Sequence, residues 1–263
     1  MSNPSPSSSE GSPQIPNTLR RNILSYLTKI SHGSAPFIST FLLIHLTAPA
    51  LANLGGSSLA SQTMLLGREY YQTSFGEKYL VLAPIAAHSL AGIAKRIFSG
   101  QKTPPRPIST LLSWTGYLTV LFFLPTHYLT HRIFPTISEP PISAVGPSEL
   151  DYEFVKVGLT NWPVTSWVLY TGLVGSVALH MVDGTTIIWN KWIGDTGAAA
   201  PSRNPSGSSF RTRRQAKLVA VGLGLVLPVL SGLYVLSKEP PMIFASMARR
   251  FEVVFTRFPL YRI

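Results

Sequence analysis

The sequence predicts an all-α polytopic membrane protein built on a bundle of five transmembrane helices. Only 13% of its 263 residues are charged, about half the ~25% of an ordinary soluble domain. Mean hydropathy is positive at +0.23. The charges lie in gaps between five long uncharged runs. A spanning helix needs about 20 apolar residues because lipid offers no partner for backbone N–H and C=O groups.

Each of the five runs is long enough to cross a bilayer. They lie within residues 31–67 (apolar centre 35–54), 79–94, 107–131, 157–182 and 218–237. Lys95 and Arg96 extend the second run, because their apolar stems can lie in lipid while the charges reach the interface. A soluble helical bundle would need polar helix faces at a 3.6-residue period, which the runs lack.

Four regions follow from this pattern. Residues 1–16 are rich in Ser and Pro, which predicts a disordered tail. Residues 17–31 place Leu19, Ile23 and Leu27 on one helical face, which predicts an amphipathic interfacial helix. Residues 32–240 form the five-helix domain. Residues 241–263 mix Phe with Arg and predict an amphipathic C-terminal tail, expected to be a second interfacial helix.

The acidic segment 134–156 carries Glu139, Glu149, Asp151 and Glu153. Its spacing matches no EF-hand pattern, so we expect a solvated loop and no metal site.

Several function classes are excluded. The net charge is +11, but the basic residues do not cluster on a folded polar face as nucleic-acid binding requires. The absence of Cys excludes disulfides, iron–sulfur clusters and a thiol nucleophile. The chain carries no dinucleotide fingerprint after a strand. We therefore expect neither a nucleic-acid partner nor enzymatic turnover by this chain alone; membrane lipids are its expected surroundings.

The loop charges predict an orientation. With five spans, thirteen Lys and Arg lie beside the N-terminus and in the second and fourth loops, against four in the first and third loops. By the positive-inside rule, the N-terminus is cytosolic.

Five of the six histidines fall within or at the end of the first four spans: His45, His88, His127, His131 and His180. Ionisable residues at bilayer depth are costly and commonly functional. Their depths would let His45 face His127 or His131 near one side, and His88 face His180 near the other. Two facing imidazoles can ligate a haem iron, so up to two b-type haems are possible. The alternative is that the histidines are hydrogen-bonded packing residues.

Two of these histidines share a short motif with a glycine. His88 precedes Gly92 by four residues, and His180 precedes Gly184 by four. Residues i and i+4 share a helix face. A glycine there leaves room for a flat porphyrin or for a closely packed helix.

The histidine order resembles that of the two-haem membrane anchor of succinate dehydrogenase and fumarate reductase. In that family the first four of five helices each supply one axial histidine. The histidine of helix one pairs with that of helix three, and the histidine of helix two with that of helix four. The run from His88 to Arg96 is similar to that family's second-helix ligand segment. The resemblance implies haem iron ligation by His45, His88, His127 and His180.

The chain also resembles the fungal Mcp-one type adapter of the mitochondrial outer membrane. The segments that carry this resemblance are Ser31-His32-Gly33-Ser34-Ala35-Pro36, Gly67-Arg68-Glu69-Tyr70-Tyr71, Pro84 to Arg96, and His180 to Gly184. The family is implicated in mitochondrial lipid homeostasis, and its members can bypass loss of the endoplasmic reticulum–mitochondria encounter structure.

This second resemblance implies that the protein recruits a bridge-like lipid-transfer protein of the vacuolar-protein-sorting class to organelle contact sites through a cytosolic Pro-x-Pro motif. Two segments match that motif, Pro4-Ser5-Pro6 in the tail and Pro105-Arg106-Pro107 in the second loop. Proline lowers the ordering cost of an extended peptide, which suits docking in a groove.

Overall fold

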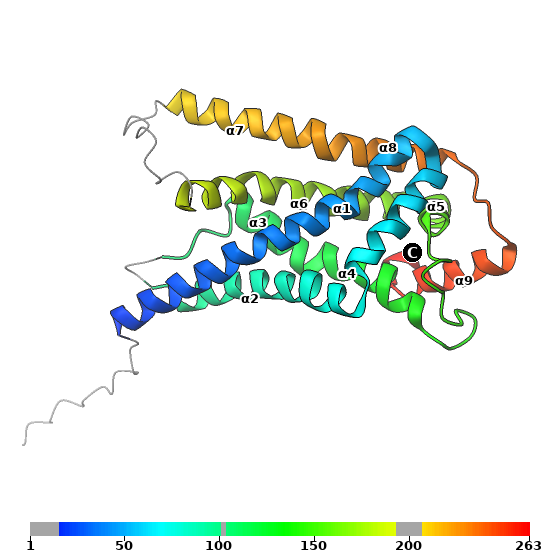
Figure 1. Cartoon of the computed structure of the whole chain (residues 1–263), viewed down its shortest axis with the longest axis horizontal. Coiled ribbons are helices and arrows are strands. Elements are labelled where there is room, and N and C mark those ends of the chain that lie inside the picture. The colour runs from blue at the N-terminus through cyan, green and yellow to red at the C-terminus, as the bar shows by residue number, and fades with distance from the viewer. Residues whose placement is uncertain (1–15, 101–103, 193–206) are drawn as a thin grey trace, which may run out of the picture.

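The computed structural model describes residues 16–100, 104–192 and 207–263, with the side chains of residues 207–211 left out. The regular elements of these residues are helices, and the long ones run side by side in a bundle (Figure 1). Residues 1–15 of the predicted tail, which include Pro4 and Pro6, lie outside the described part.

Four helices in the described part are long and apolar enough to cross a membrane. The first is α1 (Asn17–Tyr71), and the second joins η1 (Gly76–Leu82) to α2 (Ala83–Phe98). The third is α6 (Pro163–Trp192). The fourth, Thr212–Lys238, runs through α7 (Gly207–Val221), η5 (Gly222–Val226) and α8 (Leu227–Lys238). They match the first, second, fourth and fifth predicted spans.

The third predicted span is helical but is not among these four. Residues 111–133 form α3 (Leu111–Leu118), η2 (Thr119–Phe123), α4 (Leu124–Tyr128) and η3 (Leu129–Ile133) without a break. The second half of this helical stretch holds His127, Tyr128 and His131, which lower its apolar content. α3 packs against α6, whereas α1 packs against α2 and α8.

α1 is one helix of 55 residues with a kink at Gly55 and Gly56. Gly56 has φ +58° and ψ −155°, a conformation that only glycine adopts readily. The kink follows directly on the apolar centre predicted at 35–54. At residue 31, where the interfacial helix was expected to end, the helix continues unbroken into the first span.

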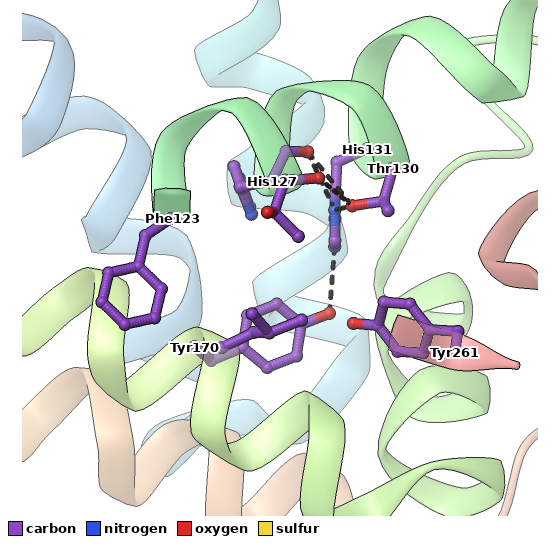
Figure 2. A pocket seen from close by; sticks show the side chains of 8 residues that line it. Phe123, His127, Thr130, His131, Tyr170 and Tyr261 are labelled. Carbon is purple, nitrogen blue, oxygen red and sulfur yellow. Dashed lines mark hydrogen bonds between the residues drawn. The ribbon is translucent and has the colours of Figure 1, made fainter. Parts of the chain in front are cut away.

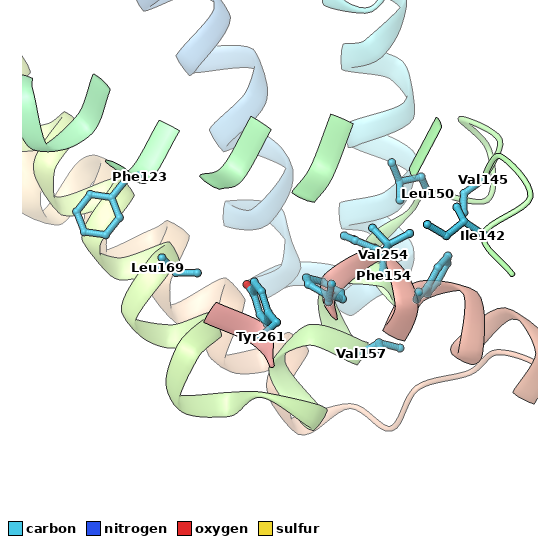
Figure 3. Packing of buried hydrophobic residues seen from close by; sticks show 11 residues of the cluster. Phe123, Ile142, Val145, Leu150, Phe154, Val157, Leu169, Val254 and Tyr261 are labelled. Carbon is cyan, nitrogen blue, oxygen red and sulfur yellow. The ribbon is translucent and has the colours of Figure 1, made fainter. Parts of the chain in front are cut away.

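A compact cap closes one end of the bundle. It consists of η4 (Phe134–Thr136), the loop after it, α5 (Tyr152–Asn161), α9 (Ala245–Thr256) and η6 (Pro259–Tyr261). Phe154, Phe251, Phe255 and Tyr261 are at most 1% exposed and meet in one aromatic core (Figure 3). The C-terminal helix is amphipathic as predicted, but the chain itself covers the apolar face of α9, which was expected to lie at a lipid interface.

The acidic segment was also expected to be a solvated loop, and this too needs correction. Glu149 accepts hydrogen bonds from the Gly146 N–H (2.7 Å) and pairs with Arg250 (3.0 Å). The Asp151 carboxylate caps α5 by accepting from the Glu153 N–H. Glu149 and Asp151 therefore help to build the cap, whereas Glu139 is exposed to solvent as expected.

Candidate histidine site in the helix bundle

The structure brings His45 and His127 together in the half of the bundle near the cap. Their ring centroids lie 6.0 Å apart at an angle of 79°. Phe41 stacks on His45 from one turn earlier in α1, and Tyr71 packs edge-on against both of these rings. The buried His45 Nδ1 has no hydrogen-bond partner among the described residues. A buried nitrogen without a partner is costly unless a ligand completes it.

His88 and His180 form a second pair with the same geometry. Their centroids are also 6.0 Å apart, at 80°. His88 Nδ1 lies 2.9 Å from the Ser31 carbonyl oxygen, and His180 Nδ1 lies 3.0 Å from the Leu112 carbonyl oxygen. A carbonyl can only accept, so each Nδ1 carries the proton and each Nε2 keeps its lone pair. This is how a backbone partner prepares a histidine to bind a metal.

His131 is placed differently from His127. Its Nδ1 contacts the Thr130 hydroxyl at 2.7 Å, and its Nε2 contacts the Tyr170 hydroxyl at 2.9 Å (Figure 2). Both ring nitrogens are therefore engaged within the protein. His127 stacks on His131 at 4.3 Å and faces His45 on its other side. This geometry favours His127 over His131 as a ligand.

A small polar cavity lies beside these two histidines. Its lining includes Thr126, Thr130, Tyr170 and Tyr261 as well as His127 and His131 (Figure 2). Its volume is about 10 Å³, which is about the space that one water molecule requires.

The two glycines that follow His88 and His180 by four residues do not pack against the histidine rings. Gly92 is exposed and a Cβ built on it meets no atom within 4 Å, and one on Gly184 meets only Leu112 Cδ1 at 3.9 Å. Gly116 on α3 is different: a Cβ there would lie 2.9 Å from the His180 ring. Sequence reasoning missed Gly116 because nothing in its own span shows that it faces a histidine on another helix.

The imidazole pairs have the donor type and spacing of two axial ligands to one iron. Each pair offers two imidazoles at one separation, and the second pair has its tautomers fixed. Metal–imidazole bonds are about 2 Å long, so one iron fits between two rings whose centroids are 6.0 Å apart. In the described ranges no group of three or more His, Asp or Glu side chains gathers in a metal-binding cluster.

The second Pro-x-Pro segment lies on the surface between α2 and α3. Pro105, Arg106 and Pro107 are exposed and lie outside regular secondary structure. The Arg96 guanidinium donates to the Arg106 carbonyl at 2.6 Å and to the Tyr117 hydroxyl at 2.9 Å. Arg96 therefore fixes this loop.

Residues 122–237 match the family model of the transmembrane domain of MDM10-complementing protein 1. The match includes His127, His131 and His180, and the resemblance to the Mcp-one type family is confirmed over this part of the chain. No curated protein and no solved structure matches the chain significantly.

Proposed function

Since residues 122–237 match the MDM10-complementing protein 1 transmembrane domain, we propose that this chain is a multi-pass adapter of the mitochondrial outer membrane that acts in lipid homeostasis. Its bundle consists of the four apolar helices and the helical stretch 111–133, which together give five spans. In this role the protein catalyses no reaction. It recruits a bridge-like lipid-transfer protein of the vacuolar-protein-sorting class.

The two ends of the bundle differ in charge, which supports a cytosolic N-terminus. α2 and α6 end, and α3 and α7 begin, at the end opposite the cap (Figure 1). Lys95 lies close enough to Lys191 and Arg106 for their charges to interact. Lys and Arg near span ends favour the cytosolic side.

The loop that holds Pro105 and Pro107 is the described segment best suited to recruitment. It is exposed at the basic end, outside regular secondary structure, and anchored through Arg96. Ile108 follows directly and is 53% exposed, so it offers an apolar side chain beside the two prolines. A partner groove gains from such a segment because its two prolines restrict the backbone, so that less conformational entropy is lost on docking.

A recruitment assay tests this role. We expect a fluorescent lipid-transfer partner to concentrate at mitochondria in cells that express the wild-type protein and to disperse with Pro105→Ala/Pro107→Ala. Pro240→Ala/Pro241→Ala is the matched control, because these exposed prolines follow α8 near the cap. A Pro4→Ala/Pro6→Ala variant separates the tail from the loop. Unchanged recruitment in both the loop and the tail variants would refute the Pro-x-Pro mechanism.

The histidine geometry supports a second function, binding of b-type haem. This proposal rests on the two histidine pairs, whose ring centroids are 6.0 Å apart in both cases. In the second pair, backbone carbonyls also accept from both Nδ1–H groups. A bound haem would supply one-electron chemistry. The chain itself orients the imidazoles.

Absorption spectroscopy of the purified full-length protein, expressed with added haem, tests this second function. We expect a low-spin reduced-minus-oxidised spectrum, diminished by about half in His88→Ala/His180→Ala and retained in His131→Ala. A spectrum without haem features would reduce the histidines to packing residues. That outcome would leave the adapter role intact.

A further inference from the structure

A narrow apolar groove lies between α6 and the last membrane-spanning helix, on the side of α6 away from the histidine pairs. Its volume is about 190 Å³. Gly175, Ala178 and Val182 line it from α6, and Leu218, Gly222 and Val226 line it from α7 and η5. These α6 residues follow a spacing of three to four, so they share one helix face.

The two helices stay apart along this face although small residues would let them meet. Gly, Ala and other small residues at a helix interface normally permit close backbone contact in membranes. Here a Cβ built on Gly175 or on Gly222 meets no atom within 4 Å. The space is therefore wider than the missing side chains alone would create.

Positive charge lies where the groove meets the basic end of the bundle. Arg214, one turn before Leu218, pairs at 3.0 Å with Asp183, which directly follows Val182. This pair cancels the only acidic charge of α6. Lys217 donates to the Thr186 hydroxyl at 2.7 Å, a neutral partner, and its side chain is exposed. Arg213 is exposed four residues before Lys217, on the same helix face.

We propose that this groove binds one anionic phospholipid, with an acyl chain between α6 and η5 and the phosphate beside Lys217 and Arg213. The groove is narrow and apolar, which fits an acyl chain and excludes a polar solute. Apolar burial gives little selectivity inside a bilayer, since lipid tails are as apolar as the groove. Selection must come from the head group, and basic sites beside membrane helices favour anionic lipids.

The proposal rests on the membrane-spanning placement of α6 and α7–α8 and is independent of the Pro-x-Pro loop. Native mass spectrometry of the full-length protein in detergent tests it, with phosphatidylglycerol and phosphatidylcholine of matched acyl chains as probes. We expect phosphatidylglycerol to bind several-fold more tightly. Arg213→Gln/Lys217→Gln should reduce this preference by about fivefold for each charge removed. Lys238→Gln, at the opposite end of the same helix, should leave it unchanged.

A second variant tests the groove itself. Ala178→Leu should fill the groove and weaken the binding of both lipids. An elution volume equal to that of the wild-type protein would show that the variant is folded. Equal affinity for the two lipids in the wild type, or equal effects of the Lys217 and Lys238 variants, would overturn the proposal. The Pro105→Ala/Pro107→Ala protein should lose recruitment but keep its lipid preference. This outcome would support a lipid site that is independent of the adapter role.

Discussion

His88 and His180 face each other from α2 and α6 with their ring centroids 6.0 Å apart, and each Nδ1 lies within hydrogen-bond distance of a backbone carbonyl oxygen. The two carbonyls come from α1 and α3, so four helices determine the position of one histidine pair. Such an arrangement holds ring orientation better than side-chain partners alone, because the backbone of a packed helix cannot rotate away.

Gly116→Ala should disturb this pair specifically. The added methyl group would lie 2.9 Å from the His180 ring, so the ring or α3 must shift. We expect weaker haem retention and a changed spectrum for one of the two haems, measured on the purified protein. Gly175→Ala is the control because its Cβ meets open space. Identical spectra for both variants and the wild type would contradict this placement of His180.

Gly56→Ala should destabilise the kink in α1. Gly56 has φ +58° and ψ −155°, and holding a residue with a side chain in that region costs about 1–3 kcal/mol. The new Cβ would also meet the Glu239 carboxylate, which accepts from the Ser57 N–H at 3.1 Å.

Thermal unfolding in detergent measures this loss. Gly33→Ala, in the same helix, is the control: its Cβ meets nothing within 4 Å, so alanine should be neutral or stabilising by up to about 1 kcal/mol. Equal unfolding midpoints for Gly56→Ala and Gly33→Ala would show that the conformation of Gly56 does not contribute to stability.

Lys156 is a buried cation whose removal should weaken the contact between the cap and the bundle. Its side chain is 1% exposed, and its Nζ lies 2.7 Å from Glu153 Oε1 and 3.4 Å from Glu239 Oε2. Removing one partner of a buried pair costs about 3–5 kcal/mol because the remaining charge stays uncompensated. We expect Lys156→Ala to lower the unfolding midpoint sharply.

The compensating variant Lys156→Ala/Glu153→Gln is the informative control. It removes one of the stranded carboxylates, so part of the lost stability should return. A double variant as unstable as the single one would mean that packing of the lysine stem, and not charge, sets the effect.

Glu149→Gln should destabilise the cap in a pH-dependent way. The Gly146 N–H and the Arg250 guanidinium hold the pKa of Glu149 below its usual 4.5. A lowered pKa in the folded state stabilises the protein above the unfolded pKa, and this stability is lost as pH falls through the folded value.

Because the Glu149 side chain is 37% exposed, solvent screens this pairing, and the cost of Glu149→Gln should be about 0.2–1 kcal/mol at pH 7. This cost should shrink as the pH falls below 4.5. Unfolding midpoints of the variant and the wild type across this range measure it. Glu139→Gln, which changes an exposed acid of the same segment, should show no such trend. A constant difference between the Glu149 variant and the wild type at all pH values would contradict the role of the ionised carboxylate.

The sequence allows prediction of the histidine neighbours because depth in a membrane is set by position along a span. Helices of similar length cross the same thickness, so His88 and His180 could be placed at one level before any packing was known. The choice between His127 and His131 needed the structure. It depends on Tyr170, which lies on another helix and whose hydroxyl contacts His131 Nε2, so that this nitrogen is already hydrogen-bonded.

The cap could not be predicted for a different physical reason. The apolar face of α9, with Phe251 and Phe255, satisfies the requirements of a lipid interface and of a protein core equally well. Only the three-dimensional contact with Phe154 of α5 shows that the partner is protein. The continuation of α1 through residue 31 was not predictable either, because Gly33 and Pro36 at this junction are typical of helix ends, yet the helix runs through both.

The most direct test of the proposed adapter function is a rescue experiment. The full-length chain is expressed in fungal cells that lack the endoplasmic reticulum–mitochondria encounter structure, and growth and mitochondrial phospholipid content are measured. We expect the wild-type protein and Pro240→Ala/Pro241→Ala to restore both, and Pro105→Ala/Pro107→Ala to restore neither at equal protein levels. Failure of the correctly inserted wild-type protein to restore either quantity would contradict a role in mitochondrial lipid supply.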